Sequence, residues 1–258
     1  SALAQSSRVD LKKPLVVAQV ALSLTLLIAA GLFVRALDAA RAIELGFDTD
    51  RLITAPLSIN LLRYTTTQGR EFYRDAVERV EALPGVEAAT LARVAVMGGG
   101  GRTVGWRVQG REEVEAAPGS GQAGPPFALG RNLINANVIG PNFFATLGIS
   151  LLSGRDFDGR DSPEAPRVAI INEAAAKLHF PGADPLGALV SFRGPAAGPW
   201  YEVVGVVGNS KYADLTENEL PVVYMPLAQN HETGMKLYVR AGGPPGSLVR
   251  PIRHEIQA

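Results

Sequence analysis

Asp156, Asp158 and Asp161 resemble the start of a loop that binds calcium. Carboxylate oxygens suit this hard cation, but an EF-hand loop also needs a glycine at its sixth position and a glutamate at its twelfth. In this sequence the glycine comes too early and the closing glutamate is absent. The three carboxylates therefore predict a solvated turn rather than a calcium site.

Two glycine-containing stretches are candidates for a phosphate site. Gly98 to Arg102 could cradle a phosphate, but a phosphate loop needs a preceding strand, a following helix and a Lys or Ser/Thr at a fixed spacing. None of these features is present, which predicts a flexible loop. Gly205-x-x-Gly208 follows a strand, but the third glycine of a dinucleotide fingerprint and a clear following helix are missing. We interpret this pair as the end of a strand.

The three histidines, His179, His231 and His254, are scattered along the chain, and one of them lies at a helix end where a cation is favourable. The absence of cysteine excludes disulfides, thiolate metal sites and cysteine nucleophiles. No serine lies in a G-x-S-x-G elbow. The sequence therefore predicts a binding or force-transmitting module rather than an enzyme, with no catalytic, cofactor-binding or metal-binding residues.

The composition restricts the class of protein further. A chain of 258 residues can hold one large or two small domains in addition to a membrane span. The 25 basic and 25 acidic residues give a formal net charge of zero, which argues against a nucleic-acid binder because such proteins carry a basic excess. The 28 glycines and 18 prolines predict many turns and loops.

The segment around which the chain is organised runs from Pro14 to Val34 and contains no charged residue. At about 1.5 Å per residue, a helix of this length reaches about 32 Å, which matches the roughly 30 Å hydrocarbon core of a bilayer. Lys12 and Lys13 precede it and Arg35 follows it. The pattern predicts a transmembrane helix over 14–36.

Three polar side chains within this segment are compatible with lipid. Ser23 and Thr25 can donate their hydroxyls to the carbonyl one turn earlier, so they cost little in lipid. Gln19 carries an amide that needs a partner, which predicts that its side of the helix faces another helix.

Two other interpretations of the apolar segment remain open. A buried helix of a soluble protein can be this apolar, although such helices are usually shorter and carry a polar face. Ala29 and Gly31 form the small-x-small pair of a signal-peptide cleavage site. However, the apolar run continues past this pair, and polar sequence without an initiator Met precedes it. We therefore favour a retained span, and we expect Ser1 to be an internal residue of a longer protein.

The regions on either side of the span differ in character. Residues 1–13 are polar and predict a cytoplasmic juxtamembrane linker. After the span, helical periodicity continues until Gly46, which predicts a stalk helix over 37–48. Lys and Arg are slightly more frequent before the span than after it, which favours a cytoplasmic N-terminus. Residues after about 37 would then lie in the extracytoplasmic space.

The remaining sequence, 49–258, predicts an α+β fold. Alternating and β-branched stretches predict strands at Arg51–Ile59, Val86–Val94, Thr103–Gln109, Asn132–Ile139, Arg167–Ile171, Leu189–Phe192, Tyr201–Val207, Val222–Pro226 and Lys236–Arg240. Helical periodicity and stop signals predict helices at Gly69–Leu83, Asn142–Leu147, Glu173–Phe180 and Ser247–Gln257. Asn172 and Ser247 are predicted N-caps, and Gly148 is a predicted helix stop. Pro56 predicts an edge strand or a bulge, because proline cannot donate to a ladder.

We predict that these elements form two lobes. Lobe one, 49–100 and 217–258, should contain one sheet backed by the helices at Gly69–Leu83 and Ser247–Gln257. Its strands are those at Arg51–Ile59, Val86–Val94, Val222–Pro226 and Lys236–Arg240. Lobe two, 101–216, should be an insertion whose ends lie close together, because strands before and after it must share that sheet.

Seven ordered blocks between Leu11 and Ala258 carry a family resemblance. They are LVVAQVALSLTLLIAAGLFVRAL, LGFDTDRLITAPLSI, FYRDAVERVEALPGVEAAT, NVIGPNFFATLGISLLSGRDF, VAIINEAAAKLHFPGADPLG, YEVVGVVGNSKY and PVVYMPLAQ. Together they resemble the MacB-like periplasmic core domain, with the first membrane helix, of FtsX-type ABC-transporter permeases. The resemblance is greatest to the large permeases that carry two such modules and often lack a fused ATPase.

The resemblance implies a stalked periplasmic domain of two mixed α/β lobes, in which the second lobe is inserted into a porter-like first lobe. It also implies location in the bacterial inner membrane, contact with membrane lipid and partnership with a cytoplasmic ABC ATPase subunit. A dimer of permease modules and a periplasmic partner protein are further expectations. No catalytic or ligand residues of the family are matched, because the family pattern is structural.

The leading hypothesis is therefore a non-catalytic extracytoplasmic part of an ABC-transporter permease, which transmits ATP-driven motion across the membrane for export or envelope remodelling. Because the sequence stops at Ala258, before the further spans that a permease needs, we expect that this chain alone does not transport. The alternative is a membrane-anchored periplasmic binding or regulatory domain that recruits an envelope enzyme. A membrane-anchored enzyme is a third hypothesis, which the missing catalytic set disfavours.

Overall fold

The structure is a computed structural model of the chain. It divides into two units, Ser1–Glu44 and Leu45–Ala258, which are considered separately. The residues that it describes are 12–41, 45–49, 51–60, 64–96, 98, 102–111, 133–192, 198–212 and 217–257.

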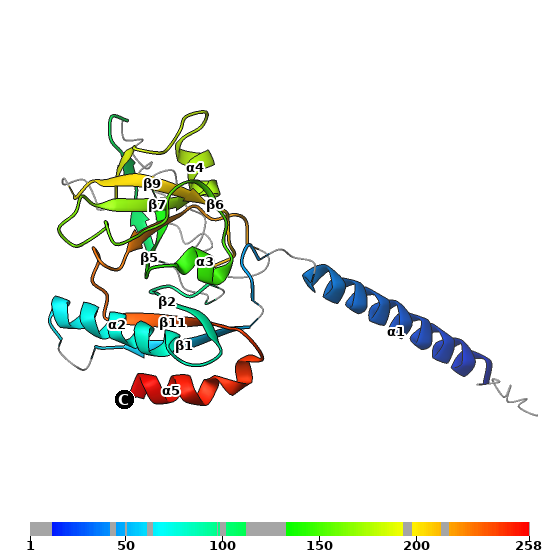
Figure 1. The fold of residues 1–258 in the computed structure, drawn as a ribbon. Coiled ribbons are helices and arrows are strands. Elements are labelled where there is room, and N and C mark those ends of the chain that lie inside the picture. Colours follow the sequence, from blue (N-terminus) through cyan, green and yellow to red (C-terminus); the bar gives the residue numbers. More distant parts are fainter. Residues whose placement is uncertain are drawn as a thin grey trace, which may run out of the picture. The chain divides into compact units, whose positions relative to one another are not determined.

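The first unit contains one long helix, α1 (Lys12–Arg41), shown in Figure 1. Its stretch Leu15–Asp38 is the one helix in the described part of the chain that is long and apolar enough to cross a membrane. Ser23 Oγ donates to Gln19 O and Thr25 Oγ1 donates to Ala21 O, each at 2.9 Å. The expected bonding of both hydroxyls to the preceding turn is therefore confirmed.

The observed stalk helix is shorter than the predicted one, which extended over 37–48. Helix α1 is described as far as Arg41, and the chain from Leu45 to Asp48 is not helical. Gly46 has a φ of +73°, and a Cβ at this position would lie 2.0 Å from Asn209 O. The left-handed conformation and the close approach of the Asn209 backbone both require glycine here, and they turn the chain out of helical geometry.

In the second unit, three antiparallel strands form one part of the sheet, in the order β1 (Leu52–Ser58), β11 (Gly234–Ala241), β2 (Val86–Ala92). Helices α2 (Thr66–Glu81) and α5 (Val249–Gln257) cover one face of these strands (Figure 1). Alternate residues of β11 point to the two faces, as a strand requires. Those on the face of α2 and α5 join a common core with residues of both helices, including Tyr73, Val80, Leu237, Val239, Leu248 and Ile252.

The ends of the helices follow local capping signals. Helix α2 begins before the predicted Gly69, because Thr65 and Gln68 form a capping box. The short 3-10 turn η1 (Pro245–Ser247) precedes α5, and Ser247 Oγ donates to Pro244 O at 2.9 Å. The prediction that Ser247 is an N-cap is therefore wrong, because its hydroxyl is used as a donor within the preceding turn.

Helix α3 (Phe143–Leu147) lies on the opposite face of the three-stranded part. Phe143 meets Tyr238 edge to face at 6.1 Å between ring centroids, and Phe144 meets Tyr224 in the same way at 4.9 Å. Gly148 ends α3 with a φ of +74°, which confirms the predicted stop. This aromatic cluster joins β11 to a strand of the other part of the sheet.

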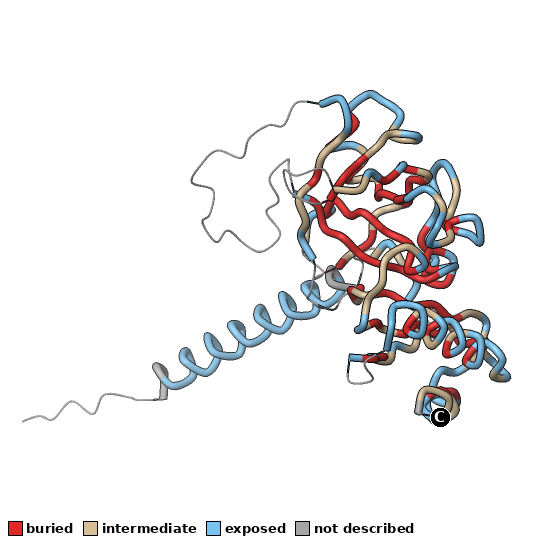
Figure 2. Tube along the Cα trace, turned by 90° about the vertical axis from the view of Figure 1, so that its left-hand side faces the viewer, coloured by how far each residue is buried: buried red, intermediate tan, exposed pale blue. Residues whose placement is uncertain are grey.

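The other part of the sheet is mixed, and its strands are mostly buried (Figure 2). Strands β5 (Leu133–Ile139) and β10 (Val222–Pro226) are parallel to each other, as are β7 (Val168–Asn172) and β9 (Tyr201–Val207). Helix α4 (Glu173–His179) follows β7, with Asn172 Oδ1 accepting from Ala175 N at 3.0 Å, so the predicted N-cap is confirmed. The path runs β5 (Leu133–Ile139), β10 (Val222–Pro226), β7 (Val168–Asn172), β9 (Tyr201–Val207), β8 (Leu189–Ser191), β4 (Arg107–Val108). In addition, β3 (Arg102–Gly105) pairs with β5, and β6 (Leu151–Gly154) pairs with β9.

The predicted place of Val222–Pro226 is wrong. This strand pairs with β5 and β7, both within 101–216, rather than with the strands of the three-stranded part. Every residue of β10 is buried, as expected for a central strand covered on both faces, whereas the prediction placed it in a sheet with one helical layer. The two parts are joined through β2 and β5 at the pair Ala92 and Ile139. The predicted ends of the insertion, Gly101 and Thr216, lie outside the described residues.

Two further elements differ from prediction. The single strand predicted over Thr103–Gln109 is divided into β3 and β4, which have different partners. Trp106 lies between them and is buried, with its ring 5.8 Å from that of Phe192. Burial of this large ring turns the chain between the two strands. Strand β6 was not predicted, because its sequence Leu-Leu-Ser-Gly has no alternating pattern and all four residues are exposed.

Candidate functional site

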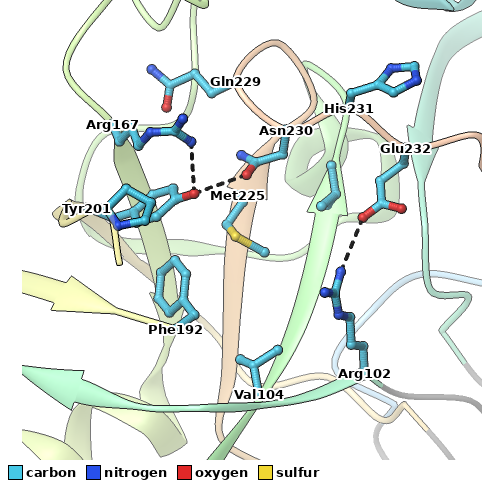
Figure 3. Close-up of a pocket in the computed structure, with 12 residues that line it drawn as sticks. Arg102, Val104, Arg167, Phe192, Tyr201, Met225, Gln229, Asn230, His231 and Glu232 are labelled. Carbon is cyan, nitrogen blue, oxygen red and sulfur yellow. Dashed lines mark hydrogen bonds and ion pairs between the residues drawn. The ribbon is translucent and has the colours of Figure 1, made fainter. Parts of the chain in front are cut away.

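A cleft of about 360 Å³ lies between the mixed part of the sheet and the loop that joins β10 to β11 (Figure 3). Arg102 comes from β3, Arg167 precedes β7, and Tyr201 begins β9. Asn230 and Glu232 come from the loop. These polar residues of the cleft thus come from four segments that are distant in sequence.

One wall of the cleft is a hydrogen-bonded chain. Arg167 Nη1 donates to Tyr201 Oη at 3.1 Å, and this hydroxyl donates to Asn230 Oδ1, also at 3.1 Å. The guanidinium carbon of Arg167 lies 5.5 Å from the centroid of the Tyr201 ring. Asn230 Nδ2 donates to Pro226 O at 3.0 Å, which fixes the amide. Among the described residues, no carboxylate forms an ion pair with Arg167.

The opposite wall carries a carboxylate shared by two arginines. Arg93 Nε lies 2.9 Å from Glu232 Oε2, and Arg102 Nη1 lies 3.5 Å from Glu232 Oε1. The side chain of Glu232 is 19% exposed and that of Arg102 is 50% exposed. With Arg167, three guanidinium groups and one carboxylate leave an excess of positive charge around the cleft.

The remaining lining is apolar except for Gln229 and His231, and His231 Nδ1 is buried without a hydrogen-bond partner among the described residues. Apolar side chains contribute Val104, Val138, Phe192, Pro199 and Met225. The side-chain amide of Gln229 bonds to the backbone: Oε1 accepts from Val168 N at 3.1 Å, and Nε2 donates to Pro166 O and Ser162 O at 3.0 and 3.2 Å. In the part of the chain that the structure describes, no cluster of three or more metal-ligating residues occurs. These side chains favour the binding of a ligand over catalysis, because no nucleophile lies beside a base in the lining.

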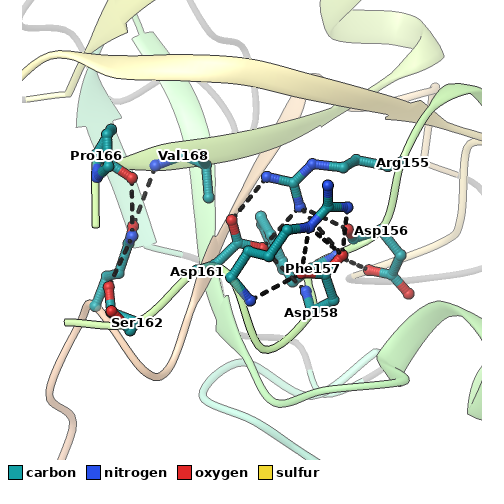
Figure 4. Close-up of polar contacts among 10 residues, drawn as sticks. Arg155, Asp156, Phe157, Asp158, Asp161, Ser162, Pro166 and Val168 are labelled. Carbon is teal, nitrogen blue, oxygen red and sulfur yellow. Dashed lines mark hydrogen bonds and ion pairs between the residues drawn. The ribbon is translucent and has the colours of Figure 1, made fainter. Parts of the chain in front are cut away.

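Arginines bind two carboxylates of the candidate calcium loop, those of Asp158 and Asp161, whereas the carboxylate of Asp156 accepts from Phe157 N at 2.6 Å (Figure 4). Arg155 binds Asp161 with two hydrogen bonds of 2.8 and 2.7 Å, and Arg160 binds the exposed Asp158 at 2.7 Å. Burial raises the pKa of Asp161, but the hydrogen bonds from Arg155 and from Asp158 N lower it by more. The pKa of Asp161 therefore lies below its ordinary value. The sequence predicted a solvated turn. This prediction is only partly correct, because Asp161 is buried.

The histidines lie in three different environments. His179 ends α4 and is buried, with its ring 4.9 Å from Trp106. Burial, together with the positive charge of Arg111, lowers the pKa of His179 to about 4, so this helix end carries a neutral ring. His231 contacts α2 beside Gly69, and His254 is exposed on α5. The structure does not bring the three together.

The two glycine-containing stretches have structural roles where they are described. Gly205 lies within β9, and a Cβ there would lie 2.4 Å from Arg155 O, so the close approach of the backbone requires glycine. Gly208 follows directly after β9, which confirms the predicted strand end. Gly98 N donates to Ala95 O at 3.2 Å in a turn, and residues 99–101 lie outside the described residues.

A second hollow, of about 540 Å³, runs along α2. Tyr73, Val77 and Leu91 give it an apolar lining. On its rim, Arg74 lies 3.8 Å from Glu78 and 3.0 Å from the neighbouring Asp75. The charges of this rim are therefore largely compensated, unlike those of the cleft.

Sequence reasoning did not identify the residues of the cleft. Arg102, Arg167 and Tyr201 come together only through strand pairing, and no short motif contains them. One local signal exists, because Gln229 to Glu232 form an unbroken polar run between two strands. Such a run is also typical of an ordinary solvated loop, so it does not indicate a site by itself.

Comparison with known proteins agrees with this architecture. The family model described as MacB-like periplasmic core domain matches residues 15–257. The periplasmic region of MacB from Actinobacillus actinomycetemcomitans is similar in structure, with a TM-score of 0.53 and 14% identity over 82% of this chain and 85% of that one. A domain of a protein described as a permease from Porphyromonas gingivalis has a TM-score of 0.50 and 16% identity over 81% and 83% of the two chains.

No curated protein matches the sequence. The two solved structures establish likeness of fold, since their identity to this chain is low. The family model covers nearly the whole sequence, which confirms the resemblance carried by the seven blocks. The chain therefore belongs to the family of MacB-like periplasmic core domains, which are non-catalytic domains of ABC-type permeases.

Proposed function

We propose that this chain is the membrane-anchored, extracytoplasmic part of an ABC permease and transmits ATP-driven motion between the membrane helix and the outer domain, for export or envelope remodelling. The family implies a cytoplasmic ATPase partner, which supplies the hydrolysis. The role of the outer domain is then to move as a body when the membrane helices move. Transmission of this kind requires a firm attachment where the chain enters the domain.

The attachment of the entry segment, Leu45 to Asp48, is the observation that carries the proposal. Lys211 N donates to Leu45 O at 2.9 Å, and Asp48 N donates to Leu147 O at 2.7 Å. These bonds hold both ends of a segment that begins within four residues of the last described residue of α1. Displacement of the segment would therefore pull directly on α3, to which Leu147 belongs.

An ion pair extends this attachment to the sheet. Arg240 Nη1 lies 2.6 Å from Asp48 Oδ2, and Arg240 Nε donates to Thr146 O at 2.7 Å. The side chain of Arg240 is only 12% exposed. Because Arg240 belongs to β11, the middle strand of the three-stranded part, the pair joins the entry segment to both α3 and the sheet.

Hydrogen exchange in the complete permease with its ATPase tests the proposal. Trapping the ATP-bound state should change amide protection in peptides that contain 45–49 and α3, because strain enters the domain there. Asp48→Ala should reduce this change while ATP hydrolysis continues. Lys177→Gln, which removes an exposed ion pair with Glu173 on α4, is the matched control and should leave the change intact. Equal protection of 45–49 and α3 in both nucleotide states would contradict the proposal.

The same proposal places α1 in the membrane with the N-terminus in the cytoplasm and Asp48 onward outside it. The exposed apolar surface of α1 supports this placement, and the amide of Gln19 favours a second membrane helix beside it. An alkaline-phosphatase fusion after Thr49 should be active. Leu26→Arg should weaken insertion, because a charge at a helix centre costs about 2.5 to 3.5 kcal/mol on translocon scales. An inactive phosphatase fusion, together with a fluorescent cytoplasmic reporter at the same position, would contradict this topology. It would place Asp48 onward in the cytoplasm.

A further inference from the structure

We propose that the cleft between β3, β9 and the β10–β11 loop binds a small anion that carries a phosphate or carboxylate group. The inference is independent of the proposed function, since it concerns binding within the outer domain alone. It depends on three features of the cleft: an arginine with no ion-pair partner among the described residues, a second arginine whose partner is shared, and a volume that limits the size of the ligand.

Arg167 is held ready to bind an anion. A guanidinium group carries five N–H donors, and among the described residues the one hydrogen bond of the Arg167 side chain goes to Tyr201 Oη. The hydroxyl of Tyr201 is itself fixed by Asn230, and the Tyr201 ring lies beside the guanidinium group. The side chain is therefore positioned by neutral groups, which leave its positive charge available to a ligand.

Arg102 supplies a second positive charge at the opposite side of the cleft (Figure 3). Its contact with Glu232 is long, at 3.5 Å, whereas Arg93 binds the same carboxylate at 2.9 Å. Glu232 is thus engaged mainly by Arg93, and the charge of Arg102 is only partly compensated. An anion that enters the cleft gains two guanidinium groups and meets one carboxylate.

The size and lining of the cleft limit what can bind. A volume of about 360 Å³ accommodates a phosphate or carboxylate group with a short organic part, but not a folded protein. Phe192 and Met225 give the organic part an apolar surface. Two sources have this chemistry: a free organic anion, and the headgroup of a phospholipid.

Calorimetry on the full chain, purified in an uncharged, phosphate-free detergent, tests the proposal with two probes. Inorganic phosphate should bind saturably with a stoichiometry of one. Short-chain dihexanoyl phosphatidylglycerol is the second probe, and tighter binding than phosphate would assign the site to a lipid headgroup, whereas equal binding would assign it to a free anion. The absence of saturable binding for both probes would overturn the proposal.

Substitutions that each remove one charge should change the affinity for phosphate in opposite directions. Arg167→Gln should weaken phosphate binding about 10-fold or more, because it removes a charge-assisted hydrogen bond. Glu232→Gln should strengthen binding about threefold, because it removes the opposing charge. Arg79→Gln, which removes the same charge from the exposed side of α2, is the matched control and should have no effect.

A purely structural role for these residues gives different results. Thermal unfolding checks that each variant is folded. If Arg167→Gln is unstable, Arg167→Lys gives a second measurement, and its affinity for phosphate should be lower than that of the parent protein but still measurable. Equal losses in Arg167→Gln and Arg79→Gln would show non-specific attraction and overturn the proposal. Weaker binding in a folded Glu232→Gln protein would also overturn the proposal. Removal of a negative charge from the cleft should strengthen the binding of an anion there.

Discussion

Asp161 shows how single residues of this domain use their charge. Its spacing from Asp156 and Asp158 resembles an acidic metal loop, yet its carboxylate is buried against Arg155 and accepts from Asp158 N. The three hydrogen bonds use most of the roughly four lone-pair sites of a carboxylate. The charge therefore stabilises the turn and is not available to a cation.

Replacement of Asp161 should be far more costly than replacement of its neighbour Asp158. Asp161→Asn leaves the partly buried Arg155 without its carboxylate, so we expect a loss of about 3 kcal/mol in the free energy of unfolding. Asp158→Asn, where 42% of the side chain is exposed, should cost less than about 1 kcal/mol. Chemical denaturation of the full chain in detergent measures both. Equal losses in the two variants would show that burial of the pair does not matter.

The buried ring of His179 predicts a dependence of stability on pH. Its pKa is lowered to about 4 in the folded protein, whereas the ordinary value is 6.5. The unfolded chain therefore takes up a proton first as the pH falls, so stability is complete above about pH 6.5 and declines down to about pH 4. The shift corresponds to roughly 3 kcal/mol.

Denaturation curves between pH 7 and pH 4 check this prediction. His179→Phe keeps an aromatic ring beside Trp106 and should remove the loss of stability in this window. His254→Phe, at an exposed position on α5, is the control variant and should retain the loss. The same slope in parent and His179→Phe proteins would mean that another group causes it.

At the scale of single residues, the sequence was informative about local roles and uninformative about the cleft. Asn172 and Gly148 act as predicted because caps and stops depend on a few neighbouring residues. The sequence could not predict that Arg102 and Arg167 line the same cleft, because their proximity depends on the order of strands in the sheet. That order is set by packing between distant segments rather than by local pattern.

At the scale of elements, strand β1 illustrates how a proline position can be explained. Arg51 O accepts from Ala241 N, and Ile59 N donates to Thr233 O, each at 2.8 Å. Odd-numbered residues of β1 therefore bond to β11, and even-numbered residues, Pro56 among them, direct their backbone groups away from it. Pro56 thus costs no ladder hydrogen bond, and the edge predicted from it is confirmed because β1 ends the strand order.

Pro56 should also protect this edge against pairing with another chain. Pro56→Val restores an outward N–H and adds a β-branched side chain, so we expect more oligomer and aggregate in size-exclusion chromatography. Pro56→Lys restores the same N–H but adds an exposed charge, and it should remain as monodisperse as the parent protein. Identical behaviour of all three proteins would show that the proline has no protective role.

Most helices and strands were predicted as elements, but the position of one fully buried strand within the sheet was not. Helix α2 and strands β2 and β11 were found because their apolar residues follow the period of the element. The run Val222–Pro226 was recognised as a strand, but a strand that is buried throughout carries no sign of which neighbours it has. Its assignment to the wrong sheet followed from this lack of a signal.

At the scale of the whole molecule, the domain combines a three-stranded part that carries α2 and α5 with a mixed part that carries α4. The ion pair of Asp48 with Arg240 and the bonds to α3 fix the entry segment to the domain. The family resemblance was recognisable from the sequence, since ordered blocks extend over nearly all of it. The lobe boundaries at 101 and 216 stay a prediction.

The most direct test of the account is the distance between the outer domain and the membrane in the complete permease with its ATPase. These 258 residues contain no cysteine, so Arg253→Cys on α5, in a complex whose other cysteines have been replaced, provides a labelling site for energy transfer to labelled lipid. We predict a shift of several ångströms between the nucleotide-free and ATP-trapped states, which Asp48→Ala reduces while hydrolysis continues. An internal pair at Arg79→Cys and Arg253→Cys should not change. An unchanged distance to the membrane in an actively hydrolysing complex would contradict the account.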